Sequence, residues 1–225
     1  MPLILNIETA TEVCSVALAR DGKLLSIRES NSGFTHSENI TVFISEIIHE
    51  AEVSLYDLDG VAVSKGPGSY TGLRIGVSTA KGLCFAIDKP LISVPTLVSL
   101  TNNFFNNKQE VRSDRHFFCP MLDARRMEVY CAVYDSELNE VEPTSAKIIE
   151  ENSFQNILET NTVYFFGNGA SKCKSIIKHS NAVFVDDVNA SASSMISLSG
   201  NLFAERKFED VAYFEPFYLK DFVAK

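Results

Sequence analysis

The sequence contains no long cluster of basic residues. Its formal net charge is −9, and no Lys/Arg run is longer than the pair Arg125 and Arg126. A protein that holds nucleic acid on its own neutralises several phosphates with lysine and arginine. We therefore expect no independent grip on a phosphate backbone, and any contact with nucleic acid should depend on a partner.

The sequence also lacks the segments that direct a chain to a membrane. The first ten residues, MPLILNIETA, have no basic region and too short an apolar run for a signal peptide. No apolar stretch approaches the roughly 20 residues that span a bilayer. The expectation is a cytoplasmic protein with no membrane partner.

The cysteines lack the spacing of a metal site and the even number of a disulfide framework. There are five of them, no two are spaced as C-x-x-C, and most lie inside apolar runs. They are Cys14, Cys84, Cys119, Cys131 and Cys173. Buried free thiols in a reducing compartment are the simplest interpretation.

The composition of the chain is that of an ordinary globular protein. Of its 225 residues, 45% are hydrophobic and 22% are charged. Such a chain can bury a core and is not disordered. Its length fits one large domain or two small ones.

A glycine-rich loop is the most distinctive stretch. It reads GPGSYTGLRIG over residues 66–76, between a predicted strand at 60–64 and a predicted helix at 72–87. No lysine follows it as in a P-loop, and its glycine spacing is one residue too long for the dinucleotide-binding motif. It is either a tight crossover whose glycines permit close packing or a ligand cradle. The loop residues singled out are Gly66, Pro67, Gly68, Ser69, Tyr70, Thr71, Gly72 and Arg74.

Hydrophobic patterning in the first half predicts three strands, a helix, a strand, a helix, a strand and a helix. A capping box, THSE at residues 35–38, marks the start of the first helix. Residues 102–113 are polar and predict a linker. The predicted strands are 3–7, 13–19, 23–29, 60–64 and 91–94, and the predicted helices are 35–51, 72–87 and one that begins near Pro95.

The second half repeats this order, and an acidic residue, Glu8 or Asp123, closes the first strand of each half. The predicted strands are 116–122, 127–134, 140–147, 162–166 and 182–185, and the predicted helices are 150–159, 171–179 and 193–206. Two βββαβα units in tandem predict an α/β fold of the duplicated ribonuclease-H-like, actin-like (ASKHA) class. The expected subdomains are residues 1–106 and 107–225, with a cleft between them.

In that plan the turn after the first strand faces nucleotide phosphates, and paired carboxylates could hold Mg²⁺ or act as acid and base. The turn at residues 8–11 (ETAT) has no glycine to admit a phosphate closely, and residues 167–169 (GNG) are a weak signal for an adenosine loop. A phosphotransferase therefore stays an alternative. We interpret the cleft positions as vestigial, namely Glu8, Thr9, Thr11, Asp123, Gly167 and Gly169.

His36 is the candidate metal ligand, but Ile40 stands one helical turn later, where a second ligand would be needed. His49, His116 and His179 have no matching spacing. No Ser/His/Asp set is present, and no cysteine has a neighbouring histidine. We expect no catalytic residue, no metal and no cofactor, and we interpret His36 as a surface or interface residue.

Six stretches, in order through nearly the whole chain, resemble the TsaB (YeaZ) family. Glu8 stands where this family commonly has aspartate, and Lys220 where arginine is usual. The GPGSYTGLRIG stretch is the most specific mark. The six are ILNIETATEVCSVAL at 4–18, HSE at 36–38, GPGSYTGLRIG at 66–76, DARRMEVY at 123–130, GNGA at 167–170 and PFYLK at 216–220.

The resemblance implies two actin-like subdomains and a non-catalytic scaffold subunit in the biosynthesis of threonylcarbamoyladenosine, next to the anticodon of ANN-decoding tRNA. The implied partners are the catalytic subunit TsaD, which carries the metal-binding histidines, and the ATPase TsaE. The chain alone would form a homodimer and would meet tRNA only through the complex. A glycoprotease-like (M22-type) metallopeptidase, the other alternative, would require a metal or nucleophile that the sequence does not show.

A partner of this kind needs an apolar helical face. The helix at 35–51 has a wide apolar stripe, and the helix at 72–87 has a small-residue face, so two copies could meet as a four-helix arrangement. The same surface could accept a related partner. The alternative is that both faces are buried against the chain's own sheet. The predicted interface residues are His36, Ile40, Phe43, Ile44, Ile47, Leu73, Gly76, Val77 and Ala80.

Overall fold

The computed structural model describes residues 2–31, 36–108 and 111–220. It divides into two compact units. The N-terminal unit comprises Met1–Ser99 and Ala190–Tyr218, and the C-terminal unit comprises Leu100–Asn189 and Leu219–Lys225. Each unit is built around its own five-stranded sheet.

The sheet of the N-terminal unit has the order β3-β2-β1-β4-β5. Its first three strands form an antiparallel meander, and β4 and β5 continue the sheet in parallel with β1. Because β1 is paired on both sides, it is buried along its whole length. The strands are β1 (Leu3–Glu8), β2 (Cys14–Arg20), β3 (Lys23–Ser30), β4 (Gly60–Gly66) and β5 (Leu91–Pro95).

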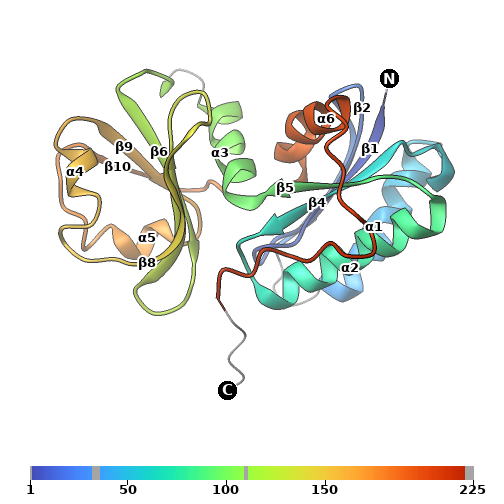
Figure 1. Cartoon of the computed structure of the whole chain (residues 1–225), viewed down its shortest axis with the longest axis horizontal. Coiled ribbons are helices and arrows are strands. Elements are labelled where there is room, and N and C mark those ends of the chain that lie inside the picture. Colours follow the sequence, from blue (N-terminus) through green and yellow to red (C-terminus); the bar gives the residue numbers. More distant parts are fainter. Residues whose placement is uncertain (1, 32–35, 109–110, 221–225) are drawn as a thin grey trace. The chain divides into compact units, whose positions relative to one another are not determined.

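Helices cover both faces of this sheet (Figure 1). Successive residues of a strand point to opposite faces. Accordingly Leu5 and Ile7 join the core under α1 (His36–Glu50) and α2 (Tyr70–Ile87), whereas Ile4 joins the core under α6 (Ile196–Ala204). Short 3₁₀ turns, η1 (Leu55–Asp57) and η3 (Ala192–Met195), complete the unit.

The sheet of the C-terminal unit has the order β10-β9-β6-β7-β8. Read from the other edge it repeats the first sheet strand for strand, again with an antiparallel meander and two parallel strands. The strands are β6 (His116–Asp123), β7 (Glu128–Tyr134), β8 (Glu140–Ile148), β9 (Thr162–Phe166) and β10 (Ala182–Val185). This repetition confirms the duplicated ribonuclease-H-like, actin-like prediction.

The C-terminal core is rich in phenylalanine. Helix α3 (Thr96–Asn107) places Phe104 against Phe166, with ring centroids 4.5 Å apart, and Phe105 edge-on to Phe118 at 4.6 Å. The helices α4 (Gln155–Leu158) and α5 (Ala170–Cys173) contribute to a second cluster. Both are single turns, so the longer helices predicted at 150–159 and 171–179 are wrong in length.

The linker predicted at 102–113 is wrong over residues 102–107, which belong to α3. Asparagines dominate that stretch, but they flank the two buried phenylalanines. The structure also differs from the expected boundary at residue 106, because residues 190–218 pack with the N-terminal unit. Met195 is buried there against β4 and β5, and Ser199 Oγ donates to Asn6 Oδ1 over 2.7 Å. The first residue of the predicted capping box, Thr35, lies outside the described residues.

Candidate functional site

The turn at residues 8–11, directly after β1, is covered by the glycine-rich loop. A Cβ atom at Gly68 would overlap the carbonyl group of Ala10, and one at Gly72 would overlap that of Thr9. Glycine at both positions permits this close approach of backbone to backbone. The contact supports the packing interpretation of the loop, because the chain itself fills the space beside it.

Hydrogen bonds fix the loop in this position. Ser69 N donates to Ala10 O over 2.7 Å, and the Ser69 hydroxyl accepts from Gly72 N at 3.3 Å as the N-cap of α2. Gly66 and Pro67 are buried, whereas Thr71 on the first turn of α2 is exposed. The first turn of α2 is thus held against the turn after β1.

The C-terminal motif PFYLK meets the same loop. Phe217 N donates to Lys65 O over 2.7 Å. The Tyr218 ring lies 4.6 Å, between centroids, from that of Tyr70, and the Arg74 guanidinium lies 5.6 Å from the Tyr70 centroid. The sequence did not predict that residues 216–218 contact this loop, because they are far from it along the chain.

Glu8 is fully buried at the end of β1. Its Oε1 accepts from Ala10 N at 2.7 Å, while Oε2 has no hydrogen-bond partner within the described chain. Burial raises the pKa of Glu8 to about 7, and the bond from Ala10 N opposes this rise only in part. The Thr9 hydroxyl beside it is also buried and, among described residues, unpartnered. This carboxyl is therefore enclosed by protein and not presented to a phosphate.

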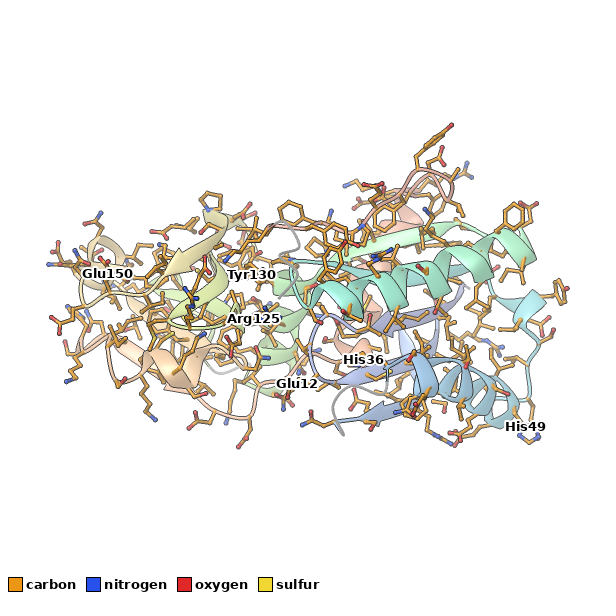
Figure 2. The ribbon with its side chains drawn as sticks, turned by 90° about the horizontal axis from the view of Figure 1, so that it is seen from below. Glu12, His36, His49, Arg125, Tyr130 and Glu150 are labelled. Carbon is orange, nitrogen blue, oxygen red and sulfur yellow. The ribbon has the colours of Figure 1, made fainter. Side chains whose placement is uncertain are left out.

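His36 is buried, which corrects the expectation of a surface residue. Its Nε2 lies 2.8 Å from Thr11 O, so the ring ties the start of α1 to the turn after β1. His49, near the other end of the same helix, is exposed (Figure 2). The sequence gave no signal for this bond, because it joins a side chain to a backbone carbonyl.

The predicted interface residues lie in the core of the N-terminal unit. Apart from Phe43, which is half-buried against the same core, every one of them is buried. A Cβ atom at Gly76 would overlap the Thr9 hydroxyl, so this glycine serves approach to the chain's own turn and not to a partner. The alternative reading, burial against the chain's own sheet, describes these faces correctly.

A different stripe of α2 is exposed. It contains small and polar residues and ends in Phe85, whose surface is 85% exposed. On the neighbouring α1, Val42 is 50% exposed. A Cβ atom at Gly82 would meet nothing within 4 Å. The exposed face of α2 is called here the exposed α2 stripe, and it consists of Thr71, Arg74, Ser78, Gly82 and Phe85.

The C-terminal unit has a similar arrangement, in which a glycine loop packs on the end of its first strand, β6. A Cβ atom at Gly167 would overlap Met121 O, and one at Gly169 would overlap the peptide that joins Leu122 to Asp123. Gly167 also has φ of +97°, which suits glycine. Gly167 and Gly169 therefore serve internal packing, whereas Asp123 is exposed.

Asp123 is held by Lys172, whose ammonium lies 2.6 Å from its Oδ1. Lys172 also donates to the carbonyl oxygens of Arg126 and Glu128, both at 2.8 Å. Asn168 Oδ1 accepts from Asp123 N at 3.0 Å. The carboxylate is thus neutralised by a lysine of its own unit.

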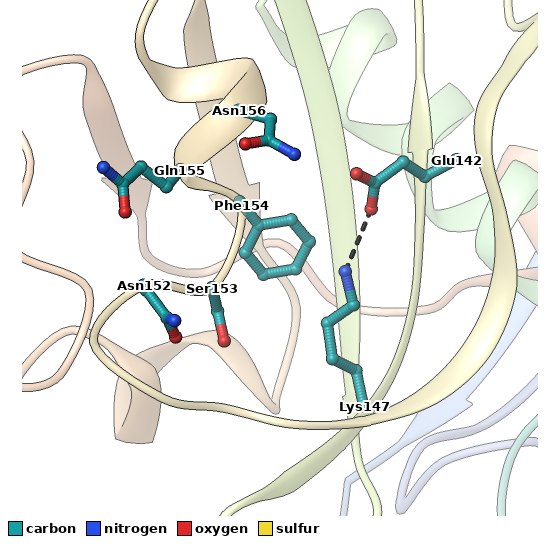
Figure 3. A pocket seen from close by; sticks show the side chains of 7 residues that line it. All are labelled: Glu142, Lys147, Asn152, Ser153, Phe154, Gln155 and Asn156. Carbon is teal, nitrogen blue, oxygen red and sulfur yellow. Dashed lines mark hydrogen bonds and ion pairs between the residues drawn. The ribbon is translucent and has the colours of Figure 1, made fainter.

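A shallow polar pocket lies elsewhere in the C-terminal unit (Figure 3). Lys147 Nζ lies 3.0 Å from Glu142 Oε2 and 4.1 Å from the centre of the Phe154 ring. The remaining lining residues are Asn152, Ser153, Gln155 and Asn156. Its only two charges neutralise each other, and none of the residues predicted from the sequence lies in it.

The part of the chain that the structure describes contains no group of three or more His, Cys, Asp or Glu side chains placed to hold a metal ion. All five cysteines are buried and free of disulfides, as predicted. Within the same residues, no helix has both the length and the apolar character needed to cross a membrane.

Two units with the same ribonuclease-H-like strand order define a protein of the actin-like (ASKHA) class. The family model described as tRNA N6-adenosine threonylcarbamoyltransferase (TsaD) matches residues 31–225. The chain is 34% identical over 235 residues to the Escherichia coli K12 protein named tRNA threonylcarbamoyladenosine biosynthesis protein TsaB, covering 98% of this chain and 96% of that one. The chain belongs to the TsaB (YeaZ) family.

Two further comparisons agree with this assignment. A tRNA N6-adenosine threonylcarbamoyltransferase of Staphylococcus aureus (strain Newman) is 41% identical over 108 residues, covering 41% of this chain and 32% of that enzyme. The solved structure of YeaZ from Pseudomonas aeruginosa has a TM-score of 0.85 at 24% identity, covering 97% of this chain and all of that one. The second comparison establishes the fold.

Proposed function

We propose that this chain is a non-catalytic scaffold subunit in the biosynthesis of tRNA threonylcarbamoyladenosine, where it pairs with a TsaD-like threonylcarbamoyltransferase. The observation that carries the proposal is that both carboxyl groups at the ends of the first strands are engaged within their own units. Glu8 is enclosed beneath the glycine-rich loop, and Asp123 is neutralised by Lys172. The sequence similarity to a TsaB protein, which covers 98% of this chain, indicates the biosynthetic pathway.

The partners follow from the same proposal. The TsaD-like subunit would carry the chemistry, a TsaE-like ATPase would complete the complex, and tRNA would be engaged through the complex in the cytoplasm. In the absence of partners the chain would associate with itself. The net charge of −9 supports this division of labour, because an acidic subunit is poorly suited to hold tRNA alone.

We place the partner surface on the exposed α2 stripe with the adjoining part of α1. A helix face that combines an open glycine with a largely exposed phenylalanine permits close approach and offers apolar area. Gly82 would supply the approach, and Phe85 and Val42 the apolar contact. This replaces the buried residues that the sequence pattern favoured.

The test compares two glycines on the same helix. Gly82→Gln adds a side chain at an exposed position, which should leave the fold as stable as before or slightly more so, because glycine is a poor helix former. The same change should abolish co-purification with a TsaD-like subunit. Phe85→Ser should weaken pairing, whereas Ile148→Ser, which removes an exposed side chain from the other unit, should leave it unchanged.

Gly76→Ala is the matched core variant, because its new Cβ would overlap the Thr9 hydroxyl. We expect it to lower the melting temperature. A Gly82→Gln protein that is folded and still pairs with the TsaD-like subunit would show that the proposed surface is wrong.

A further inference from the structure

The turn between β6 and β7 carries two adjacent arginines in an unusual backbone conformation. Arg125 and Arg126 have φ of +70° and +47°, in the left-handed region that side chains other than glycine and asparagine rarely adopt. Both are exposed. Backbone strain at exposed charged residues points to a role that the fold itself does not require.

The backbone of this turn is held firmly. Arg125 N donates to Asp123 Oδ1 over 2.7 Å, and Ala124 N donates to Glu128 O over 3.1 Å. Lys172 Nζ donates hydrogen bonds to Asp123 Oδ1 and to the carbonyl oxygens of Arg126 and Glu128. The two arginines are therefore presented on a fixed support.

The local charge is positive although the chain is acidic. The two carboxylates nearest the turn are already matched, Asp123 by Lys172 and Glu128 by Lys220. Within residues 2–31, 36–108 and 111–220, neither the Arg125 nor the Arg126 guanidinium has an ion pair or a hydrogen bond. Two unmatched positive charges remain at the tip of the turn.

Tyr130, on β7, stands beside this charge (Figure 2). Burial raises the pKa of the Tyr130 hydroxyl, and the positive charges of Lys220 and Arg125 act in the opposite direction. A protonated hydroxyl near neutral pH adds a hydrogen-bond donor next to the Arg125 side chain.

We propose that Arg125 and Arg126 bind phosphate groups of an RNA backbone, with Tyr130 as an adjoining donor. This inference rests on the proposed function and adds to it a direct contact between this subunit and tRNA inside the complex. Arginine presents a planar fork of donors that matches two phosphate oxygens. The contact is local, so it agrees with an acidic chain that does not retain RNA alone.

RNA fits the turn better than an acidic protein surface does. No large exposed apolar side chain of the described chain lies between residues 123 and 130. The centre of a protein interface is usually apolar and aromatic, whereas contacts to nucleic acid are polar and positively charged. An acidic protein partner remains a separate outcome of the test.

The test uses a double variant that suits the turn, Arg125→Asn with Arg126→Gly. Asparagine and glycine adopt the left-handed region readily, so the variant should fold at least as well as the wild type. The control, Arg20→Ala with Arg115→Ala, removes the same charge at exposed sites outside the turn. Each is assembled with the TsaD-like subunit, and binding of a fluorescently labelled, unmodified ANN-decoding tRNA transcript is followed by anisotropy at several salt concentrations.

The double variant should pair normally with the TsaD-like subunit and bind the transcript about tenfold more weakly at low salt. The slope of its log affinity against log salt should become less steep by about two, roughly one for each lost phosphate contact. The control should match the wild type in both. Unchanged affinity and slope in the variant would overturn the inference and leave the proposed function standing. A loss of pairing with the TsaD-like subunit would also overturn the inference, because it would indicate that the arginines contact a protein. A wild-type chain that does not pair with TsaD would count against the proposed function, and the inference would fall with it.

Discussion

At the scale of single residues, Glu8 is the group whose surroundings differ most from those of an ordinary carboxyl. Nothing in the segment ETAT shows that this side chain is enclosed, because an acidic residue after a strand is usually exposed or functional. The enclosure comes from the glycine-rich loop some sixty positions along the chain, and sequence reasoning noticed the glycines without their contact. The sequence pattern singled out residues that lie together in the structure, and it did not show how they pack.

The buried carboxyl predicts a pH dependence of stability. The pKa of Glu8 is about 7 in the folded chain and 4.5 in the reference state, so the folded state binds the proton more tightly. The contribution of Glu8 is therefore most favourable below pH 4.5 and is lost as the pH rises to about 7. The loss amounts to about 3 kcal/mol.

Glu8→Gln should remove this loss, because the amide cannot ionise. Urea denaturation between pH 5 and pH 8 should show the wild type falling relative to Glu8→Gln, with the gap widest at pH 8. Glu12→Gln, at an exposed position in the same turn, should follow the wild type. Parallel curves for wild type and Glu8→Gln would show that Glu8 does not titrate in this range.

At the scale of elements, the strands were predictable and the lengths of two helices, α4 and α5, were not. Every predicted strand is present within two residues of its expected ends, since alternating or continuous apolar runs between turns identify strands well. The apolar faces of α1 and α2 that the sequence suggested for a partner are buried against the chain's own sheet, for a physical reason. The most apolar side of a surface helix is the side that its own sheet buries, so a partner surface must be sought on the other side.

The segment from Glu209 to Tyr218 shows how an irregular element is held. Lys81 on α2 donates to Phe214 O over 2.8 Å and to Ala212 O over 3.2 Å. Glu209 N donates to Leu91 O over 2.9 Å at the edge of the sheet. With no helix or strand of its own, this segment depends on side chains from elsewhere, and Figure 1 shows it running past α2.

Lys81→Met should loosen this segment without unfolding the unit. Two hydrogen bonds from a charged donor are lost, which should cost about 1–3 kcal/mol. Amide exchange at Phe217, which bonds to Lys65 O, should accelerate, while exchange in β1 stays slow. Lys23→Met, at an exposed site, is the control. Unchanged exchange at Phe217 in Lys81→Met would mean that the aromatic contact of Tyr218 with Tyr70 is sufficient to hold the segment.

At the scale of the whole molecule, duplication was the most informative property of the sequence. The repeated order of elements predicted two sheets of one topology, and it also predicted equivalent positions for Glu8 and Asp123. The repeat could not show that residues 190–218 return to the N-terminal unit, because order along the chain does not specify which sheet a helix covers. In both units a glycine loop packs closely at the end of the first strand, on the turn after β1 in one unit and on the last residues of β6 in the other.

This close packing leads to a prediction for nucleotide binding. An actin-like phosphotransferase needs open turns with glycine or lysine beside the phosphates. Here the turn at residues 8–11 lacks glycine and is covered, and Asp123 is occupied by Lys172. Calorimetry with ATP and Mg²⁺ should therefore show binding weaker than about millimolar, which corresponds to less than about 4 kcal/mol. Micromolar binding accompanied by phosphate release would instead establish the phosphotransferase alternative, since the turns would then have to open and admit the phosphates.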